Sequence, residues 1–330
     1  MNFSHNLCFI LANFVKSHLL PTIKLSLPLI VNHILVASIG LIELILAGKH
    51  STNTLAAIAL GASLWTVAIM FMSGVLLAVA PVVSKTDGEN KRNKIPHITG
   101  QALWLCFGLS IISFLFLSST PWILTFLSID ELLHDDINQY VSALKWSLLP
   151  IAIFLVFRYV NDGLHWTRPS LLSGILGVLL ILPTGYLFMF GWGDFSGWGV
   201  TGLGWATFVT VSVQFVLLAA YTLKTKRFNI TNWSEMYASP DFIQLKQLLI
   251  IGLPIGASML IELGLFVGSA MIAGTMGAEI MAAHQVAINL ASLSFMAVMG
   301  MSEATAIRVG HAYGLSNMIK EEMHYALRTG

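Results

Sequence analysis

Charged residues are scarce in this chain of 330 residues, because Asp, Glu, Lys and Arg together make up only 10% of it. A soluble domain has about 25% charged residues. A chain with 56% apolar residues therefore lacks the polar groups needed to cover a water-facing surface. This scarcity excludes a soluble enzyme, a nucleic-acid-binding protein and a disordered chain. The apolar residues form long uncharged blocks, which is typical of a polytopic membrane protein.

Cysteine is almost absent too. Cys8 and Cys106 are too few for a disulfide framework, and they match no metal-ligand spacing. The sequence has no H-E-x-x-H, G-x-S-x-G, P-loop or C-x-x-C motif, so we expect neither an enzyme nor a cofactor-binding protein. A cleavable signal peptide has a basic segment before its apolar segment. In residues 1–20 Lys16 is the one Lys or Arg and follows the apolar stretch LCFILANF, so we expect no cleavable signal peptide.

Apolar blocks long enough to span a bilayer recur along the chain. A transmembrane helix needs about 20 mainly apolar residues. We predict an all-α polytopic membrane protein with eight transmembrane helices, at 25–47, 55–83, 98–123, 138–160, 170–191, 199–222, 247–273 and 280–306.

The basic residues fall in every second loop of this prediction. Fifteen of the 17 Lys and Arg residues lie on one side of the predicted spans. The opposite side holds Lys49, and Lys145 lies near the start of the fourth span. Cytoplasmic loops carry an excess of Lys and Arg, so we expect a multi-pass protein with a cytoplasmic N-terminus.

An internal repeat relates positions that lie 226 residues apart. Residues that interrupt or end helices coincide at this offset without a gap, as Pro28 does with Pro254, Gly74 with Gly300 and Gly88 with Gly314. The repeat is six predicted spans long, an even number, so both copies would have the same orientation in the membrane. Parallel halves of this kind are common in transporters. The alternative is an eight-span protein with an accidental match.

The repeat also predicts the domain organisation. We expect an N-terminal lobe at 1–222, a cytoplasmic linker at 223–246 and the start of a second lobe at 247–330. If the second lobe matches the first, the complete protein has twelve spans in a 6+6 arrangement, four more than this sequence contains.

Two acidic residues stand inside predicted spans. Glu43, in SIGLIELILAG, and Glu262, in SMLIELGLF, have uniformly apolar neighbours. Ionisable groups at bilayer depth usually face the bundle interior or a water-filled cavity. Removal of water favours the neutral form, so we expect both carboxylates to bind and release a proton. The alternative is a structural carboxylate paired with a neighbouring helix.

Polar residues in two spans are weaker candidates. His33 is either a hydrogen-bonded packing residue or part of a proton relay. His284, Gln285 and Asn289, in AAHQVAINLAS, form a polar stripe that either joins helices or lines a cavity.

Two further acids near span ends have simpler interpretations. We expect Glu303 to pair with Arg308 at the surface, five residues further on. Asp162, in RYVNDGLHWTRP, is expected to be a loop residue with a role in a turn.

Several stretches taken together resemble the multidrug and toxic compound extrusion (MATE) family, and within it the NorM-like branch. The matching stretches are IKLSLPLI, APVVSKTDGENKRNKIPH, NDGLHWTRPS, GWGVTGLGWAT, IGLPIGASMLIELGLF, AAHQVAINLASLSFM and AIRVGHAYG. The resemblance implies a twelve-helix exporter of two six-helix lobes in the bacterial inner membrane. Such a protein exchanges cationic amphipathic drugs for external Na+ or H+.

The resemblance also assigns roles to the two acids. Glu262 stands where the family carries an acid of its second-lobe cation and drug site, and Na+ is expected there if sodium is the coupling ion. Glu43 stands where many members have an Asp that serves as a first-lobe proton or drug site.

Two departures from the family pattern leave other interpretations open. Ile181 and Gly185 replace polar Asn residues of the family's fifth span, and the acid of its tenth span would lie beyond Gly330. Spans nine to twelve are expected in the continuation of a fragment, beyond an interruption in the gene, or in a separate polypeptide. The rival functions are a flippase of lipid-linked sugars and a truncated remnant that transports nothing.

Overall fold

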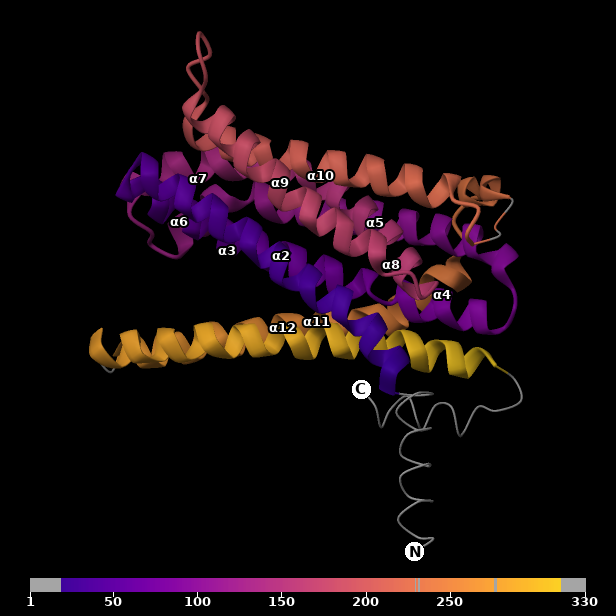
Figure 1. Ribbon diagram of the computed structural model, residues 1–330. Coiled ribbons are helices and arrows are strands. Elements are labelled where there is room, and N and C mark those ends of the chain that lie inside the picture. Colours follow the sequence, from indigo (N-terminus) through magenta and orange to yellow (C-terminus); the bar gives the residue numbers. More distant parts are fainter. Residues whose placement is uncertain (1–18, 229, 231, 276–277, 316–330) are drawn as a thin grey trace, which may run out of the picture.

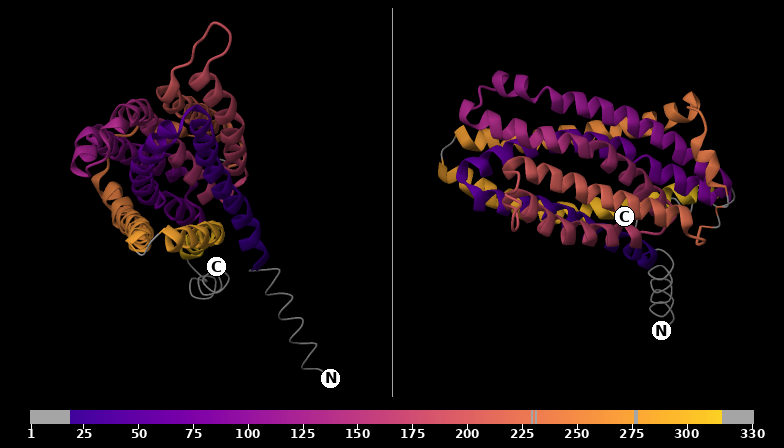
Figure 2. Two further views of the ribbon diagram at one scale, coloured as in Figure 1. Left: turned by 90° about the vertical axis from the view of Figure 1, so that its left-hand side faces the viewer. Right: turned by 90° about the horizontal axis from the view of Figure 1, so that it is seen from above.

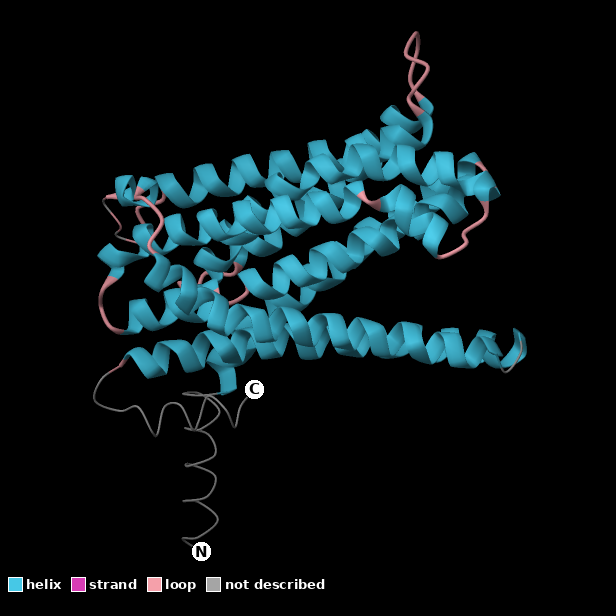
Figure 3. Cartoon of the chain, turned by 180° about the vertical axis from the view of Figure 1, so that it is seen from behind, coloured by secondary structure: helices cyan, strands magenta, loops and turns pink. Residues whose placement is uncertain are grey.

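The computed structural model describes residues 19–228, 230, 232–275 and 278–315, and this part of the chain is almost entirely helical (Figures 1 and 3), which confirms the predicted all-α fold. The α-helices are α2 (Leu20–His50), α3 (Thr52–Leu76), α4 (Val79–Gly88), α5 (Ile95–Ser118), α6 (Thr120–Phe126), α7 (Glu131–Leu144), α8 (Leu148–Gly163), α9 (Arg168–Phe190), α10 (Gly199–Lys224), α11 (Phe242–Thr275) and α12 (Ala278–Gly314). Three short 3-10 helices join them: η2 (Arg92–Lys94), η3 (Lys145–Ser147) and η4 (Trp233–Tyr237).

Seven helical segments of the described residues are long and apolar enough to cross a membrane. They begin and end close to the first seven predicted spans, although the second continues through α4 to Gly88 and the fourth starts earlier, at Glu131. Helix α12 covers the eighth predicted span, 280–306. The chain is therefore a multi-pass membrane protein.

Local chemistry sets several helix ends. Ser51 caps α3 by accepting a hydrogen bond from the backbone N–H of Thr54 at 3.0 Å, and Asp130 caps α7 through the N–H of Leu132, also at 3.0 Å. Prolines stand in the first turns of α5, α6 and α9, where a missing N–H costs nothing.

Helices α11 and α12 lie side by side along one flank of the bundle formed by α2 to α10 (Figures 1 and 2). The buried apolar core runs between α3, α4, α5, α7 and α8. The loops 89–94 and 164–167 and the described residues of 225–241 meet at one end of the bundle, together with the C-terminal end of α12. We call this the basic end, because most described Lys and Arg residues lie there. The α9–α10 loop projects from the opposite end (Figure 3).

Contacts between the two copies of the sequence repeat are reciprocal. Gly74 of α3 packs against Gly256 of α11, and Gly300 of α12 packs against Ile30 of α2. The partners are related by the 226-residue offset. A Cβ atom on Gly74 would lie 2.7 Å from the Cα atom of Gly256, so the close approach of these helices requires glycine.

The same reciprocity holds nearer the basic end. The Ser84 hydroxyl donates to the carbonyl oxygen of Ile307 at 2.7 Å, and Gly310 packs against Pro81. These partners are again 226 residues apart. Reciprocal contacts of this kind are the pattern that a two-fold axis produces between equivalent segments.

The segment between α10 and α11 is packed against the bundle at the basic end. Gln101 of α5 donates to the carbonyl oxygen of Ser239 at 3.1 Å and accepts from the N–H of Asp241 at 2.7 Å. Gly100 lets Met236 of η4 approach closely. The linker predicted at 223–246 thus contains the end of α10, η4 and the start of α11.

Candidate functional site

Glu43 is buried where α2, α7 and α10 meet. The Thr207 hydroxyl of α10 donates to its Oε1 atom, and the Tyr140 hydroxyl of α7 lies 3.4 Å from its Oε2 atom. Among the residues that the structure describes, no Lys or Arg forms an ion pair with this carboxylate. A carboxylate held only by neutral hydroxyl groups in an apolar setting can take up and release a proton or a small cation.

Apolar residues occupy the two α9 positions at which the sequence departs from the family pattern. Ile181 is fully buried, and Gly185 packs against Leu46, three residues after Glu43. These two positions, where the family has Asn, therefore contribute no hydrogen-bonding side chain.

Glu262 lies on α11 and is half-buried. Its carboxylate makes no hydrogen bond or ion pair within the described part of the chain, and the neighbouring Ile261, Leu265 and Phe266 are exposed. The described residues do not bring Glu262 into contact with Glu43. Its role as a cation site remains a prediction.

The polar stripe of α12 is described in part. The Nε2 atom of His284 lies 3.4 Å from the Ser269 hydroxyl of α11, so this histidine joins the two helices. The side chains of Gln285 and Asn289 lie outside the described residues.

A buried cluster of charged residues links α2, α8 and α12. The Nη2 atom of Arg158 lies 3.2 Å from the Oε2 atom of Glu303, and the Nε2 atom of His33 lies 3.2 Å from the same oxygen. The Nε atom of Arg158 is also 3.4 Å from the Oδ2 atom of Asp162. The Ser170 hydroxyl donates to Asp162 at 2.6 Å. The His33 side chain thus connects α2 to α12, and its role as a packing residue or as part of a proton relay stays a prediction.

Two predictions from the sequence are wrong in this region. Glu303 is buried and does not pair with Arg308, whose guanidinium contacts the Thr22 hydroxyl instead. Residues five apart on a helix point about 140° away from each other, so the two charges face different neighbours. Asp162 belongs to α8 and is fully buried. Its negative charge is compensated there by Arg158, which lies four residues earlier on the same face of the helix.

Titratable groups at the basic end lie outside the spans. Burial, followed by the nearby His311, lowers the pKa of His165 to about 4, and the two rings meet edge to face at 4.8 Å between centroids. The hydrogen bond from Lys91 lowers the pKa of Glu89. Asp87 pairs with Arg92 and lies 3.8 Å from His311.

Sequence reasoning did not identify the partners of Glu43 or the role of Arg158. Thr207 and Tyr140 stand in other helices, 164 and 97 residues away from Glu43, and no local pattern points to them. The sequence does hold a clue to the role of Arg158. It is a lone cation close to the end of an apolar span, and such a residue usually pairs with an acid inside the helix bundle.

The fold and the buried acids define a multi-pass α-helical membrane protein with isolated carboxylates in its spans. A family model described as MatE matches residues 28–187 and 254–330. The chain belongs to the MatE family. The two matches begin at Pro28 and Pro254, the residues that the 226-residue repeat pairs.

Curated relatives agree with this assignment. The chain is 37% identical to a "Probable multidrug resistance protein NorM" of Xanthomonas axonopodis pv. citri over 88% of this chain and 63% of the relative. It is 35% identical to a protein of the same name from Xylella fastidiosa, covering 95% of this chain and 68% of the relative. The "Multidrug resistance protein MdtK" of Edwardsiella ictaluri is 32% identical over 88% of this chain. The chain thus spans about two thirds of the length of these relatives.

Solved structures share the fold. A MOP superfamily transporter from Pyrococcus furiosus superposes with a TM-score of 0.80 at 21% identity, covering 96% of this chain and 70% of that one. A eukaryotic MATE transporter gives a TM-score of 0.80 at 15% identity, covering 94% of this chain and 68% of that one.

Proposed function

We propose that the whole protein exports cationic amphipathic compounds from the cytoplasm in exchange for Na+ or H+. The observation that carries this proposal is Glu43, a buried carboxylate with hydroxyl partners and no cationic partner among the described residues. The names of the relatives as multidrug resistance proteins support the same function.

The proposed mechanism is competition for negative charge. A cationic drug is held by the carboxylates of Glu43 and Glu262, and binding of a proton or Na+ cancels the charge that holds it. The drug then leaves outward, and release of the coupling ion inward restores the carboxylate. Each charge that moves across the membrane gains about 2.3 kcal/mol per 100 mV of potential. His33, His284, Gln285 and Asn289 are proposed to line the drug cavity.

The proposed orientation places the basic end in the cytoplasm of a bacterial cell, with the N-terminus on the same side of the inner membrane. Because the relatives are longer, we propose that four further helices complete the second lobe, either in the same chain or in a separate one. Reading the gene past codon 330 tests this. Four more apolar spans in the continuing sequence would support one chain, and their absence would support a separate subunit.

Ethidium efflux from cells tests the two acids. We expect Glu43→Gln and Glu262→Gln to abolish efflux driven by an ion gradient, since neither amide can exchange a cation. Asp194→Asn is the control, because this acid is exposed in the α9–α10 loop. Efflux at the wild-type rate in Glu43→Gln would refute the proposed site, and the same result in Glu262→Gln would remove Glu262 from it.

Two further measurements distinguish the remaining possibilities. Efflux that follows external Na+ at constant pH would assign sodium as the coupling ion, whereas efflux that follows the pH gradient without Na+ would assign the proton. A lipid-linked sugar flippase would bind anionic pyrophosphate lipids in preference to a cationic dye. Measuring this preference in the protein would contradict our proposal.

A further inference from the structure

An apolar groove of about 460 Å³ lies between α9 and α10 at the basic end. Its wall is made of leucines from both helices: Leu172, Leu176, Leu217 and Leu218. The Gln214 side-chain amide donates to the carbonyl oxygen of Ser173 at 2.6 Å, so the polar atoms at the floor satisfy each other. The groove is thus suited to an apolar chain.

Two cations lie against the ring of Trp166, one of the residues that line this groove. The guanidinium carbon of Arg227 lies 3.7 Å from the centroid of the Trp166 ring, and that of Arg168 lies 5.1 Å from it. The indole N–H of Trp166 donates to the Tyr221 hydroxyl at 2.7 Å, which fixes the ring. Within the described residues, neither arginine forms an ion pair with a carboxylate.

Both guanidinium groups are positively charged and no described carboxylate neutralises either of them, so this place attracts an anion. Guanidinium groups bind phosphate strongly, through paired N–H donors. Trp and Tyr side chains are typical of the membrane–water interface, the depth at which lipid phosphates lie. An apolar groove that ends in this group of side chains therefore has the two parts of a phospholipid site.

We propose that this groove binds one anionic phospholipid from the leaflet at the basic end of the protein. An acyl chain lies along the leucines of α9 and α10, and the phosphate lies beside Trp166, where Arg168 and Arg227 supply positive charge. Basic pockets between transmembrane helices recognise anionic headgroups by this combination of charge and apolar contact. Because it concerns a surface separate from Glu43 and Glu262, the proposal holds or fails independently of the transport mechanism.

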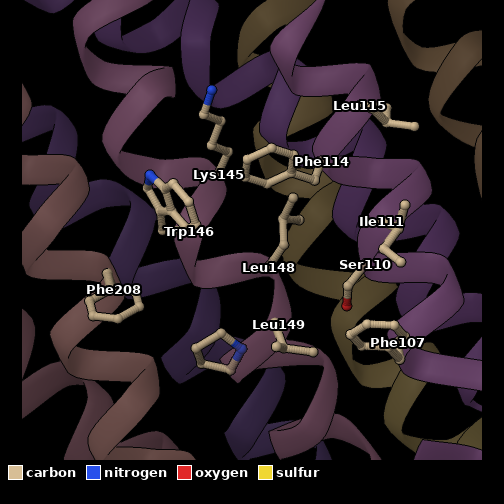
Figure 4. Close-up of a pocket in the computed structure, with 11 residues that line it drawn as sticks. Phe107, Ser110, Ile111, Phe114, Leu115, Lys145, Trp146, Leu148, Leu149 and Phe208 are labelled. Carbon is tan, nitrogen blue, oxygen red and sulfur yellow. The ribbon is translucent and has the colours of Figure 1, made fainter. Parts of the chain in front are cut away.

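A second groove on the same protein serves as an internal comparison. It is about 400 Å³ in volume and lies beside the C-terminal half of α5, among apolar side chains that include Phe107, Phe114 and Phe208 (Figure 4). Lys145 is the one cation among its lining residues, and its Nζ atom lies 4.9 Å from the Phe114 ring centroid. This groove has the apolar part of the site without the paired arginines.

Titration of the purified full chain with lipids, followed by native mass spectrometry, tests the proposal. We expect phosphatidylglycerol to bind more tightly than phosphatidylcholine with the same acyl chains. The double variant Arg168→Gln/Arg227→Gln should bind phosphatidylglycerol about 30-fold more weakly, since each cation near the surface contributes about 1 kcal/mol. Lys145→Gln should leave this affinity unchanged.

Further variants separate the headgroup from the acyl chain. Leu217→Trp, which fills the groove, should also weaken phosphatidylglycerol binding, and inorganic phosphate alone should not displace the lipid. Arg168→Lys/Arg227→Lys keeps both charges and should retain the preference for the anionic lipid. This result would show that weaker binding in the double Gln variant comes from the lost charges and not from misfolding. Equal affinity for the two lipids, or an unchanged affinity in the double Gln variant, would overturn the proposal.

Discussion

Glu303→Gln should destabilise the protein strongly, because it removes the negative charge that neutralises a buried arginine. Arg158 and Glu303 are both buried, and their nearest nitrogen and oxygen atoms are 3.2 Å apart. With an effective dielectric constant of about 20, two unit charges at this separation attract each other by about 5 kcal/mol. Removing one partner of a buried pair typically costs about 3 to 5 kcal/mol. Asp162 stays 3.4 Å from Arg158, so we expect about 3 kcal/mol.

The free energy of unfolding can be measured in detergent with a chemical denaturant. Arg158→Gln should cost more than Glu303→Gln, since it leaves the Glu303 and Asp162 carboxylates without their shared cation. The double variant should cost less than the sum of the two single variants, and the difference measures the coupling.

An exposed ion pair supplies the matched control. Lys91 and Glu89 lie 2.8 Å apart on the surface of the basic end, and exposed pairs contribute at most about 1 kcal/mol. Glu89→Gln should therefore leave the stability almost unchanged. If Glu303→Gln lowers the free energy of unfolding as little as Glu89→Gln does, the Glu303 carboxylate does not stabilise the protein through Arg158.

Three further changes have defined outcomes. Thr207→Val removes a hydroxyl donor from Glu43, so the pH profile of ethidium efflux should shift in this variant. Thr207→Ser keeps the hydroxyl and should behave as the wild type. Coincident pH profiles for the wild type and both variants would count against the role of this hydroxyl. Gly74→Val places a branched side chain against the Gly256 backbone and should lower the melting temperature by several degrees, more than Gly108→Val does at a position with open space. The folded-state pKa of His165 is about 4, below its ordinary value of 6.5, so its contribution to stability is complete above pH 6.5 and is lost as the pH falls toward 4. The difference in unfolding free energy between wild type and His165→Gln should therefore shrink over this range, and a pH-independent difference would contradict the assignment.

The sequence predicts helices well in this protein because lipid-facing helices need long apolar segments, and few other structures satisfy their backbone hydrogen bonds in a membrane. What the sequence could not predict is which faces of the helices meet. A helix that is apolar on all sides has no pattern that distinguishes its buried face from its lipid-facing side.

Long-range polar contacts show this limit most clearly. His33 and Glu303 are 270 residues apart, and each is a single polar residue in an apolar helix, so nothing in the local sequence pairs them. The nearest charge in the sequence, Arg308, was the natural candidate partner for Glu303, but it faces another direction on the helix. Asp162 was misinterpreted because Asn-Asp-Gly is typical of a turn, while its buried contacts with Arg158 and Ser170 depend on the packing of α8 against α9.

Infrared difference spectroscopy of the purified protein tests most directly whether Glu43 exchanges a proton for a cationic drug. The protonated carboxyl group has its own C=O stretching band, which Gln at the same position lacks. We expect a carboxyl band that loses intensity when ethidium is added at constant pH, and that is absent in Glu43→Gln. A band that persists in Glu43→Gln, or one that ethidium leaves unchanged, would contradict this exchange.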